Sequence, residues 1–402
     1  MMNYNFPTIS HINDVLPHIE GRDEFKVMRK DWYTVVNYVV AFGETFDWDE
    51  SDVQGSVMRR ECRGLIFDSM SGKLLSRPYH KFFNVGERPE LRMDEVDMSA
   101  YHVILEKLDG SMIRPIAVPG DKHIGEFRLG TKAGITDVAM NAEVWVAKHR
   151  NYVDFIRMAI EHDLTPIFEW CSRKNRIVVD YPVDRLVLTA VRVNSSGGYI
   201  PYRALQNFAK DYDLDLVKVI DSNSSDINDL VDTIRAWESD EGVVVRFDAP
   251  RATAWQGYGH MLKIKADAYL VLHRSKDAIS REKNIIEVVV NGQVDDLIPV
   301  LTDDDAKRLR DFQRAFWMGV DDMASEMVDV YLDGGVDIVE QKDFAQKFVH
   351  SLPKQWHPFM YGLRKGKGAR DMLVDSISKC TVSQTKIDAS RWMWGGLKWS
   401  AV

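Results

Sequence analysis

The alternation of apolar and polar residues predicts a first part of the chain that is rich in strands. Short apolar runs at 61–68 and 73–79 flank the turn-forming segment SMSG, which is typical of a β-hairpin. Two further strands are expected at 101–107 and 111–118, joined at LDG, where Asp-Gly is ordinary hairpin chemistry. We therefore expect antiparallel sheets in this part.

The pattern between residues 136 and 266 alternates between helices and strands. Apolar residues at helical spacing predict a helical stretch over 136–162, and two shorter helices over 205–212 and 227–237. Strand-length apolar runs follow one another between and after these helices, at 165–171, 175–181, 185–193, 241–247 and 261–266.

After residue 281 the pattern changes to amphipathic helices, such as the one expected over 304–332. We place a domain boundary near 280/281, with an α+β domain of antiparallel sheets and helices at 1–280 and an all-helical domain at 281–402. The apolar runs are too short for a membrane-spanning helix.

Composition narrows the class of protein further. The net charge of −9 argues against a protein that coats nucleic acid through a generally basic surface. A local basic groove on an acidic protein can still bind nucleic acid. Three widely separated cysteines form no CxxC pair, which argues against a zinc knuckle and is consistent with a reducing cytoplasm. A cytoplasmic protein without a membrane segment is expected.

The segment EKLDGSM contains the most informative lysine, Lys107, which ends one predicted strand. Amines and carboxylates recur at later strands and just upstream, at Arg63, Lys81, Glu169, Glu241, Lys263 and Lys265. The last two lysines are two residues apart, so a strand presents both on one face, where they need anionic partners or a ligand. A lysine nucleophile among cations and carboxylates is the set that nucleotidyl transfer requires.

The order KxDG, strand glutamate, EG and KxK resembles that of the covalent nucleotidyltransferases, which include ATP-dependent DNA ligases, RNA ligases and messenger-RNA capping enzymes. Within them, the chain is most similar to the bacteriophage RNA ligase 1 family, the phage tRNA-repair type. Six segments match in order across about 33–277: ECRGLIFD, SRPYHKFFNVGE, EKLDGSM, FEWCSRKNRIVVDYP, EGVVV and LKIKADAYLVLHRSKD.

This resemblance implies an adenylyltransferase domain at 1–280 and a helical RNA or tRNA specificity domain at 281–402. It implies an ATP-dependent RNA ligase that uses Mg²⁺, or Mn²⁺ in its place, and joins 5′-phosphate to 3′-hydroxyl ends through lysyl-AMP and RNA-adenylate. The implied partner is single-stranded RNA or a nicked tRNA anticodon loop. The protein would be a monomer in the cytoplasm, that of a bacterial host if it is phage-encoded.

The resemblance also implies a role for each matched residue. Lys107 is the expected nucleophile, with Lys263 and Lys265 as catalytic cations on the α-phosphate and Asp109 and Gly110 as mainly structural turn residues. The expected nucleotide contacts are Tyr38, Arg63, Lys81, Phe83, Lys107, Gly110, Glu169, Glu241, Lys263 and Lys265. Lys132 and Tyr269 are expected to serve the RNA substrate, and Glu241 and Asp295 the metal.

Several alternatives stay open from the residues alone. Core packing explains Tyr38 and Phe83 about as well as nucleotide contact, and the basic run 362–370 fits RNA contact or a solvated linker. A tryptophan-rich tail suits base stacking but more often a docked terminus. The rival functions are a DNA ligase or capping enzyme, against which the helical periodicity after 275 counts, and a non-catalytic protein that binds nucleic acid.

Overall fold

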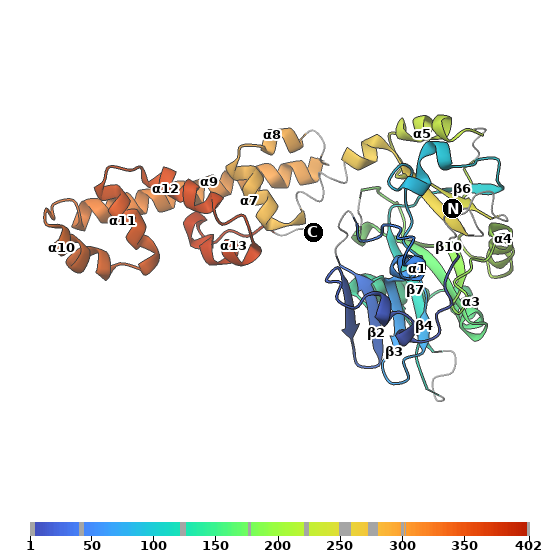
Figure 1. Ribbon diagram of the computed structural model, residues 1–402. Helices are drawn as coiled ribbons and strands as arrows, with labels where there is room; N and C mark the ends of the chain where they lie inside the picture. Colours follow the sequence, from blue (N-terminus) through green and yellow to red (C-terminus); the bar gives the residue numbers. More distant parts are fainter. Residues whose placement is uncertain are drawn as a thin grey trace. The chain divides into compact units, whose positions relative to one another are not determined.

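The computed structural model of the chain consists of two compact units, Met1–Leu270 and Val271–Val402 (Figure 1). It describes residues 5–39, 44–120, 126–175, 178–220, 225–248, 259–271, 280–298, 301 and 303–399. The expected α+β class with antiparallel sheets and a helical second part is confirmed. The assignment of one domain to adenylyl transfer and the other to RNA specificity stays a prediction.

The described residues of the first unit form three four-stranded sheets. The first has the order β1-β2-β3-β4, from Phe25–Arg29, Tyr33–Tyr38, Arg63–Asp68 and Leu74–Ser76. The second has the order β10-β9-β7-β8, from Arg185–Val193, Leu164–Cys171, Ser111–Ala117 and Phe127–Gly130. The third has the order β5-β12-β11-β6, from Phe83–Asn84, His260–Lys265, Gly242–Phe247 and His102–Glu106. All pairs are antiparallel except β5 with β12.

The helices of this unit include α1 (Val53–Glu61), α2 (Asp137–Val146), α3 (Arg150–Glu161), α4 (Tyr202–Asp211) and α5 (Ile227–Arg235). The predicted stretch 136–162 is thus two helices. Thr136 begins the first by accepting a hydrogen bond from the amide of Ala139, as an N-cap residue does. The chain leaves helical geometry at 147–149 before the second begins. The shorter helices predicted at 205–212 and 227–237 are confirmed.

The hairpin predicted at 61–79 is confirmed, because β3 pairs antiparallel with β4. The hairpin implied by LDG is wrong: β6 pairs with β11, whereas β7 pairs with β8 and β9 in another sheet. The chain crosses between two sheets at Lys107–Gly110 instead of turning back on itself. This crossing places the lysine motif where the two sheets meet.

The strand predicted at 175–181 is also wrong in its described residues, which form a short 3₁₀ turn at Arg173–Asn175 and irregular structure from 178. Both errors have one cause. The buried carboxylate of Asp109 accepts the amides of Val178 and Val179, each over 2.6 Å. Those amides therefore serve a side chain and not a neighbouring strand.

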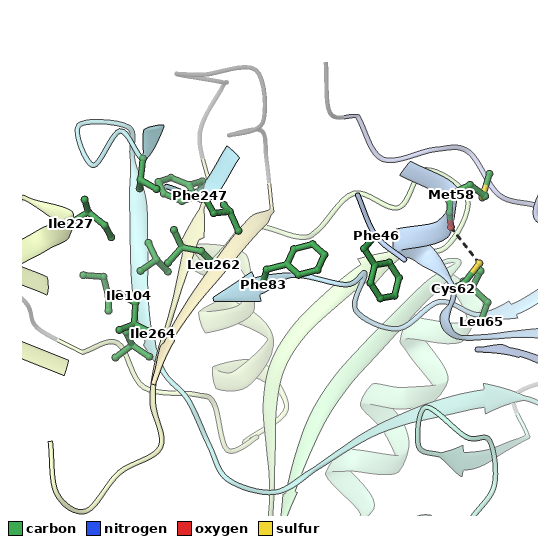
Figure 2. Packing of buried hydrophobic residues seen from close by; sticks show 14 of the residues in the cluster. Phe46, Met58, Cys62, Leu65, Phe83, Ile104, Ile227, Phe247, Leu262 and Ile264 are labelled. Carbon is green, nitrogen blue, oxygen red and sulfur yellow. Dashed lines mark hydrogen bonds between the residues drawn. The ribbon is translucent and has the colours of Figure 1, made fainter. Parts of the chain in front are cut away.

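One hydrophobic core fills the space between the first and third sheets. Phe83 lies between Leu262 and Ile264 on one side and Phe46 on the other (Figure 2). The thiol of Cys62 donates to the carbonyl of Met58 in the same core, over 3.4 Å. The core fixes the sheet that contains both Lys263 and Lys265.

The second unit is helical, as predicted. It contains α7 (Glu282–Val290), α8 (Val294–Leu297), α9 (Asp303–Gly334), α10 (Gln341–Asp343), α11 (His357–Arg364), α12 (Ala369–Ser378) and α13 (Gln384–Ser390). Trp394 and Trp399 pack into its core, so these tail tryptophans are docked and not presented for base stacking. No helix in the described part of the chain is long and apolar enough to cross a membrane.

Candidate active site

A cavity of about 570 Å³ opens in the first unit, a size suited to a nucleotide-sized ligand. Side chains from all three sheets and the loops between them surround it. The wall brings together seven residues that the sequence analysis selected: Arg63, Lys107, Gly110, Lys132, Glu169, Lys263 and Lys265. Most of the predicted nucleotide contacts therefore converge on one site.

Two lysines of the cavity wall share a single carboxylate, that of Glu241. Lys107 Nζ lies 2.6 Å from Glu241 Oε1, and Lys265 Nζ lies 2.9 Å from the same oxygen. The Lys107 amide donates to the carbonyl of Gly242, which anchors the motif to the start of β11. Gly242 has φ +139°, and a Cβ there would lie 2.1 Å from the Ile264 carbonyl oxygen, so this close approach requires glycine.

The charges around Lys107 shift the pKa values of two neighbouring groups, Glu241 and Lys263. Burial of Glu241 acts to raise its pKa, but Lys107 and Lys265 outweigh burial and hold the pKa below its usual value. Burial, reinforced by the nearby cations Lys81 and Lys107, lowers the pKa of Lys263 to about 7. The site therefore contains an ionised carboxylate and a lysine whose charge depends on what binds beside it.

Glu169 lies in the cavity wall near the C-terminal end of β9, where it pairs in register with Met112 of β7. Burial raises its pKa to about 7, although Lys107 opposes the shift. The crossing chain passes close by, since a Cβ on Gly110 would lie 2.5 Å from the Trp170 carbonyl oxygen. Glycine at 110 thus allows the lysine loop to approach β9.

A second group of cations surrounds Tyr38. Lys132 Nζ lies 5.1 Å and Lys81 Nζ 5.4 Å from the centre of its ring, within cation–π range. Burial acts to raise the pKa of Tyr38, but Lys81, Arg63 and Lys132 together lower it. Arg63 and Lys132 line the cavity, whereas Tyr38 and Lys81 are not among its lining residues.

Three predicted residues are placed differently from what the roles imply. Phe83 is 2% exposed in the core and does not line the cavity, because its neighbour Phe82 points there instead. Tyr269 is 4% exposed and donates to Asp109 Oδ1 over 2.8 Å, so it supports the lysine loop and is not open to RNA in this geometry. Asp109 is thereby a buried acceptor of three hydrogen bonds and not a turn residue.

The role predicted for Asp295 as a metal ligand stays a prediction. This residue is exposed on α8 of the second unit. The basic run 362–370 is partly structural, since Arg364 donates to the carbonyl of Ile338 over 2.8 Å.

The sequence analysis missed several residues in the wall, among them Tyr79, Phe82, Thr189 and Arg246. Arg246 had a usable signal, because it follows Glu241 on a strand next to the KxK strand. The register places Val244 opposite Lys263 and Arg246 opposite Met261, so alternation puts Arg246 on the same face as the lysines.

The carboxylates fit a magnesium ion that is held mainly by a bound nucleotide. No group of three metal-binding side chains occurs among the residues that the structure describes. Mg²⁺ in nucleotide sites needs only one or two carboxylates, because phosphates and water complete its coordination. Glu241, ionised beside Lys107 and Lys265, meets that requirement.

The chain is similar in sequence to known RNA ligases. A family model described as RNA ligase matches residues 61–269. A Thermovibrio ammonificans protein described as a candidate RNA ligase is 33% identical over 190 residues, which cover 47% of this chain and 46% of that protein. An RNA ligase of Rhodothermus phage RM378 is 23% identical over 353 residues, covering 73% of this chain and 79% of that protein. An archaeal ATP-dependent RNA ligase structure covers 88% of this chain and 95% of its own, at 12% identity and a TM-score of 0.45.

The site, with Lys107 in the cavity wall, and the matched segment are those of a nucleotidyltransferase-like protein. The chain belongs to the RNA ligase family of that model, the bacteriophage RNA ligase 1 family. The chain spans about half the length of the Thermovibrio relative that it matches.

Proposed function

We propose that the protein is an ATP-dependent RNA ligase that joins a 5′-phosphate to a 3′-hydroxyl through an AMP bound to Lys107. The observation that supports this most is the shared carboxylate: Lys107 and Lys265 both lie within 3 Å of Glu241 at the edge of a nucleotide-sized cavity. A lysine pair of this kind suits phosphate chemistry, because a second cation beside a nucleophilic amine stabilises the negative charge on the phosphate oxygens.

In the first step, Lys107 Nζ attacks the α-phosphorus of ATP. A phosphorus–nitrogen bond forms, the bond to the bridging oxygen breaks, and pyrophosphate leaves with the electron pair. The neutral amine is the nucleophile, so its proton passes to solvent before the attack, and Glu241 Oε1 at 2.6 Å accepts a hydrogen bond that orients the amine. Lys263 and Lys265 neutralise the charge on the α-phosphate oxygens during this in-line displacement.

In the second step, the 5′-phosphate of the RNA attacks the same phosphorus and releases Lys107, which gives RNA-adenylate. In the third step, a 3′-hydroxyl attacks the RNA phosphorus and AMP leaves. Arg63 and Lys132 in the cavity wall are the cations available for the incoming phosphate. Glu169 accepts hydrogen bonds from the ribose hydroxyls.

A Mg²⁺ ion, or Mn²⁺ in its place, supplies further positive charge on the phosphates when it is bound. Glu241 is the residue that would hold it, since this buried carboxylate lies beside Lys107 and Lys265 of the cavity wall.

The test is the intact mass of the protein after incubation with ATP and Mg²⁺. Wild type gains one AMP, Lys107→Ala gains none, and the matched control Lys148→Ala, an exposed lysine outside the cavity, gains one. Pyrophosphate treatment before the experiment removes AMP that is already bound. If wild type still gains no mass after that treatment, the proposal is wrong.

The RNA substrate is a separate proposal, supported by the family: single-stranded RNA or a tRNA nicked in its anticodon loop. Purified enzyme is offered 5′-phosphorylated RNA, the DNA of the same sequence and a nicked tRNA. Joining of DNA at the rate of RNA would favour the DNA ligase alternative. The monomeric state and the cytoplasmic location stay predictions.

A further inference from the structure

Arg114 of β7 is a buried cation to which the proposed chemistry gives no role. Its side chain is fully buried, and its Nη2 donates to the carbonyl oxygen of Gly64. Its Nε and Nη1 have no hydrogen-bond partner among the residues that the structure describes. Burial lowers the pKa of Arg114 to about 9, and no carboxylate of the described chain opposes this shift.

A charge in this setting opposes folding. Burial removes the hydration of a cation, and each of its donors without an acceptor adds a further loss of stability. The equally buried Arg77 and Arg192 differ, because both bind the carboxylate of Glu61. An apolar side chain of similar volume at position 114 would fold at least as well. The role of Arg114 therefore lies in the bond that it makes to Gly64.

This bond joins two sheets directly after Arg63. Gly64 is the second residue of β3 in the first sheet, whereas Arg114 belongs to β7 in the second. The backbone of Gly64 also touches the turn after β8: it has φ +96°, and a Cβ there would lie 2.5 Å from the carbonyl oxygen of Lys132. Arg63 and Lys132 both line the cavity. The bond thus holds the backbone next to one cavity cation against the backbone of another.

The space for the guanidinium comes from a second glycine. Gly130 pairs with Arg114 across β8 and β7, and a Cβ on it would lie 3.3 Å from Arg114 Nη1. Other contacts join the two sheets without Arg114, such as the bond from Ser76 Oγ to the carbonyl of Pro115 over 2.7 Å. Loss of the arginine therefore leaves the sheets packed and loosens the segment next to Arg63.

We propose that Arg114 is a positioning residue that fixes Arg63 beside Lys132 for the 5′-phosphate of the RNA. The inference rests on the proposed ligase reaction, in which these two cations receive the incoming phosphate. An in-line displacement tolerates little movement of the groups around the phosphorus, and a misplacement of about 1 Å costs about a hundredfold in rate. A bond from a rigid, buried donor to the neighbouring carbonyl prevents such a movement.

The test is a double-mutant cycle on the transfer of AMP from the enzyme to RNA. Protein that carries AMP on Lys107 is mixed with 5′-phosphorylated RNA, and the formation of RNA-adenylate is followed in a single turnover. Arg114→Met should slow this step about tenfold or more in the wild-type background and less than about twofold in the Arg63→Ala background, because it acts through Arg63. An equal slowing in both backgrounds, or no slowing in wild type, overturns the inference.

The stability of the first unit separates positioning from loss of structure. It is measured as the urea midpoint of hydrogen exchange in peptides of β9. Arg114→Met should keep this midpoint at or above that of wild type, because a buried charge is removed. The control Ile113→Val, in the core beneath the same strand, should lower the midpoint and leave the RNA-adenylate rate within about twofold. If Arg114→Met has a midpoint below that of Ile113→Val, its slowing is structural and the inference is wrong.

A milder variant covers the case in which Arg114→Met does not fold. Gly130→Ala displaces the guanidinium through the 3.3 Å contact and keeps every charge, so it takes the place of Arg114→Met in the same cycle. It should slow the step in the wild-type background and not in Arg63→Ala, and an equal effect in both contradicts the inference. Failure of the proposed ligase reaction appears differently, because wild type then carries no AMP on Lys107.

Discussion

Replacement of Asp109 by alanine tests the correction that the structure makes to the lysine motif. As a hairpin residue, Asp109 would be exposed and replaceable. In the structure it is 3% exposed and accepts the amides of Val178 and Val179 and the hydroxyl of Tyr269. These bonds connect the lysine loop to two segments distant in sequence.

The expected loss of stability follows from the donors left behind. Alanine removes the acceptor that these three donors share, and each buried donor that stays unsatisfied costs about 1–3 kcal/mol. The Tyr269 hydroxyl still has the Glu241 carboxylate beside it. Val178 and Tyr269 are buried, but Val179 is half-buried and finds water, so the sum is reduced. We expect Asp109→Ala to lower the free energy of unfolding of this unit by about 3–5 kcal/mol, near the upper end of single substitutions.

Variants that remove only some of the three hydrogen bonds to Asp109 should lower the free energy of unfolding by smaller amounts. Tyr269→Phe deletes one donor and should cost about 1–2 kcal/mol, a typical single buried hydrogen bond to a charged group. Asp109→Asn should lie between wild type and Asp109→Ala, because one amide oxygen still accepts the Val178 and Val179 amides.

The assay is native-state hydrogen exchange in urea, read on peptides of β7 and β9 so that the second unit does not contribute. Asp68→Ala is the matched control: Asp68 also accepts two backbone amides, but at the solvent-exposed β3–β4 turn where water replaces it. Its loss should stay below about 1 kcal/mol. If Asp109→Ala loses as little free energy of unfolding as Asp68→Ala, the carboxylate of Asp109 is not the buried hydrogen-bond acceptor that the structure shows.

Three further predictions concern titrating groups. Because burial raises the pKa of Glu169 to about 7, wild type should lose stability relative to Glu169→Gln as the pH rises from about 4.3 to 7. Urea unfolding across that range measures this, and a difference in free energy of unfolding that does not change with pH contradicts it. The pKa of Lys263 is about 7, and a bound phosphate raises it. The protein should therefore take up protons when it binds a non-hydrolysable ATP analogue at pH 7.5, and the Lys263→Met variant should take up fewer. Calorimetry in buffers of different ionisation heat measures this uptake. Burial raises the pKa of the Cys62 thiol, and that of Cys171 to about 12, so native alkylation should label Cys380 well before either of them, which peptide mapping checks; equal labelling would contradict this.

The local elements were predictable because their patterns are local. The strands containing Glu169, Lys263 and Lys265 and the helices after 281 follow from hydrophobic periodicity alone. The cluster around Lys107 was also accessible, since the alternation of Lys263 and Lys265 indicates one face of a strand that needs an anion. Glu241 meets that need for Lys265.

What failed depended on contacts between distant segments. Asp-Gly after a strand is a hairpin signal, and nothing near Asp109 in sequence reveals that the amides of residues 178 and 179 bind its carboxylate. Likewise, KFFN contains two adjacent phenylalanines that a strand directs to opposite sides. The sequence does not say which one faces the cavity, and the core around Phe46 settles it in favour of Phe82.

The charge balance of the cavity fits the polyphosphate that we propose as its ligand, although the protein as a whole is acidic. The chain has a net charge of −9, yet Arg63, Lys107, Lys132 and Lys265 converge on a wall where Glu241 is ionised and Glu169 is about half neutral near pH 7. The local excess is positive, and within about 10 Å it outweighs the screened acidic surface. Lys263 then adapts to the ligand, since its pKa of about 7 lets it gain full charge only when a phosphate is beside it. The positive charge of the site is thus greatest when a phosphate is bound. It is smaller in the empty site, where the lysines would otherwise repel one another.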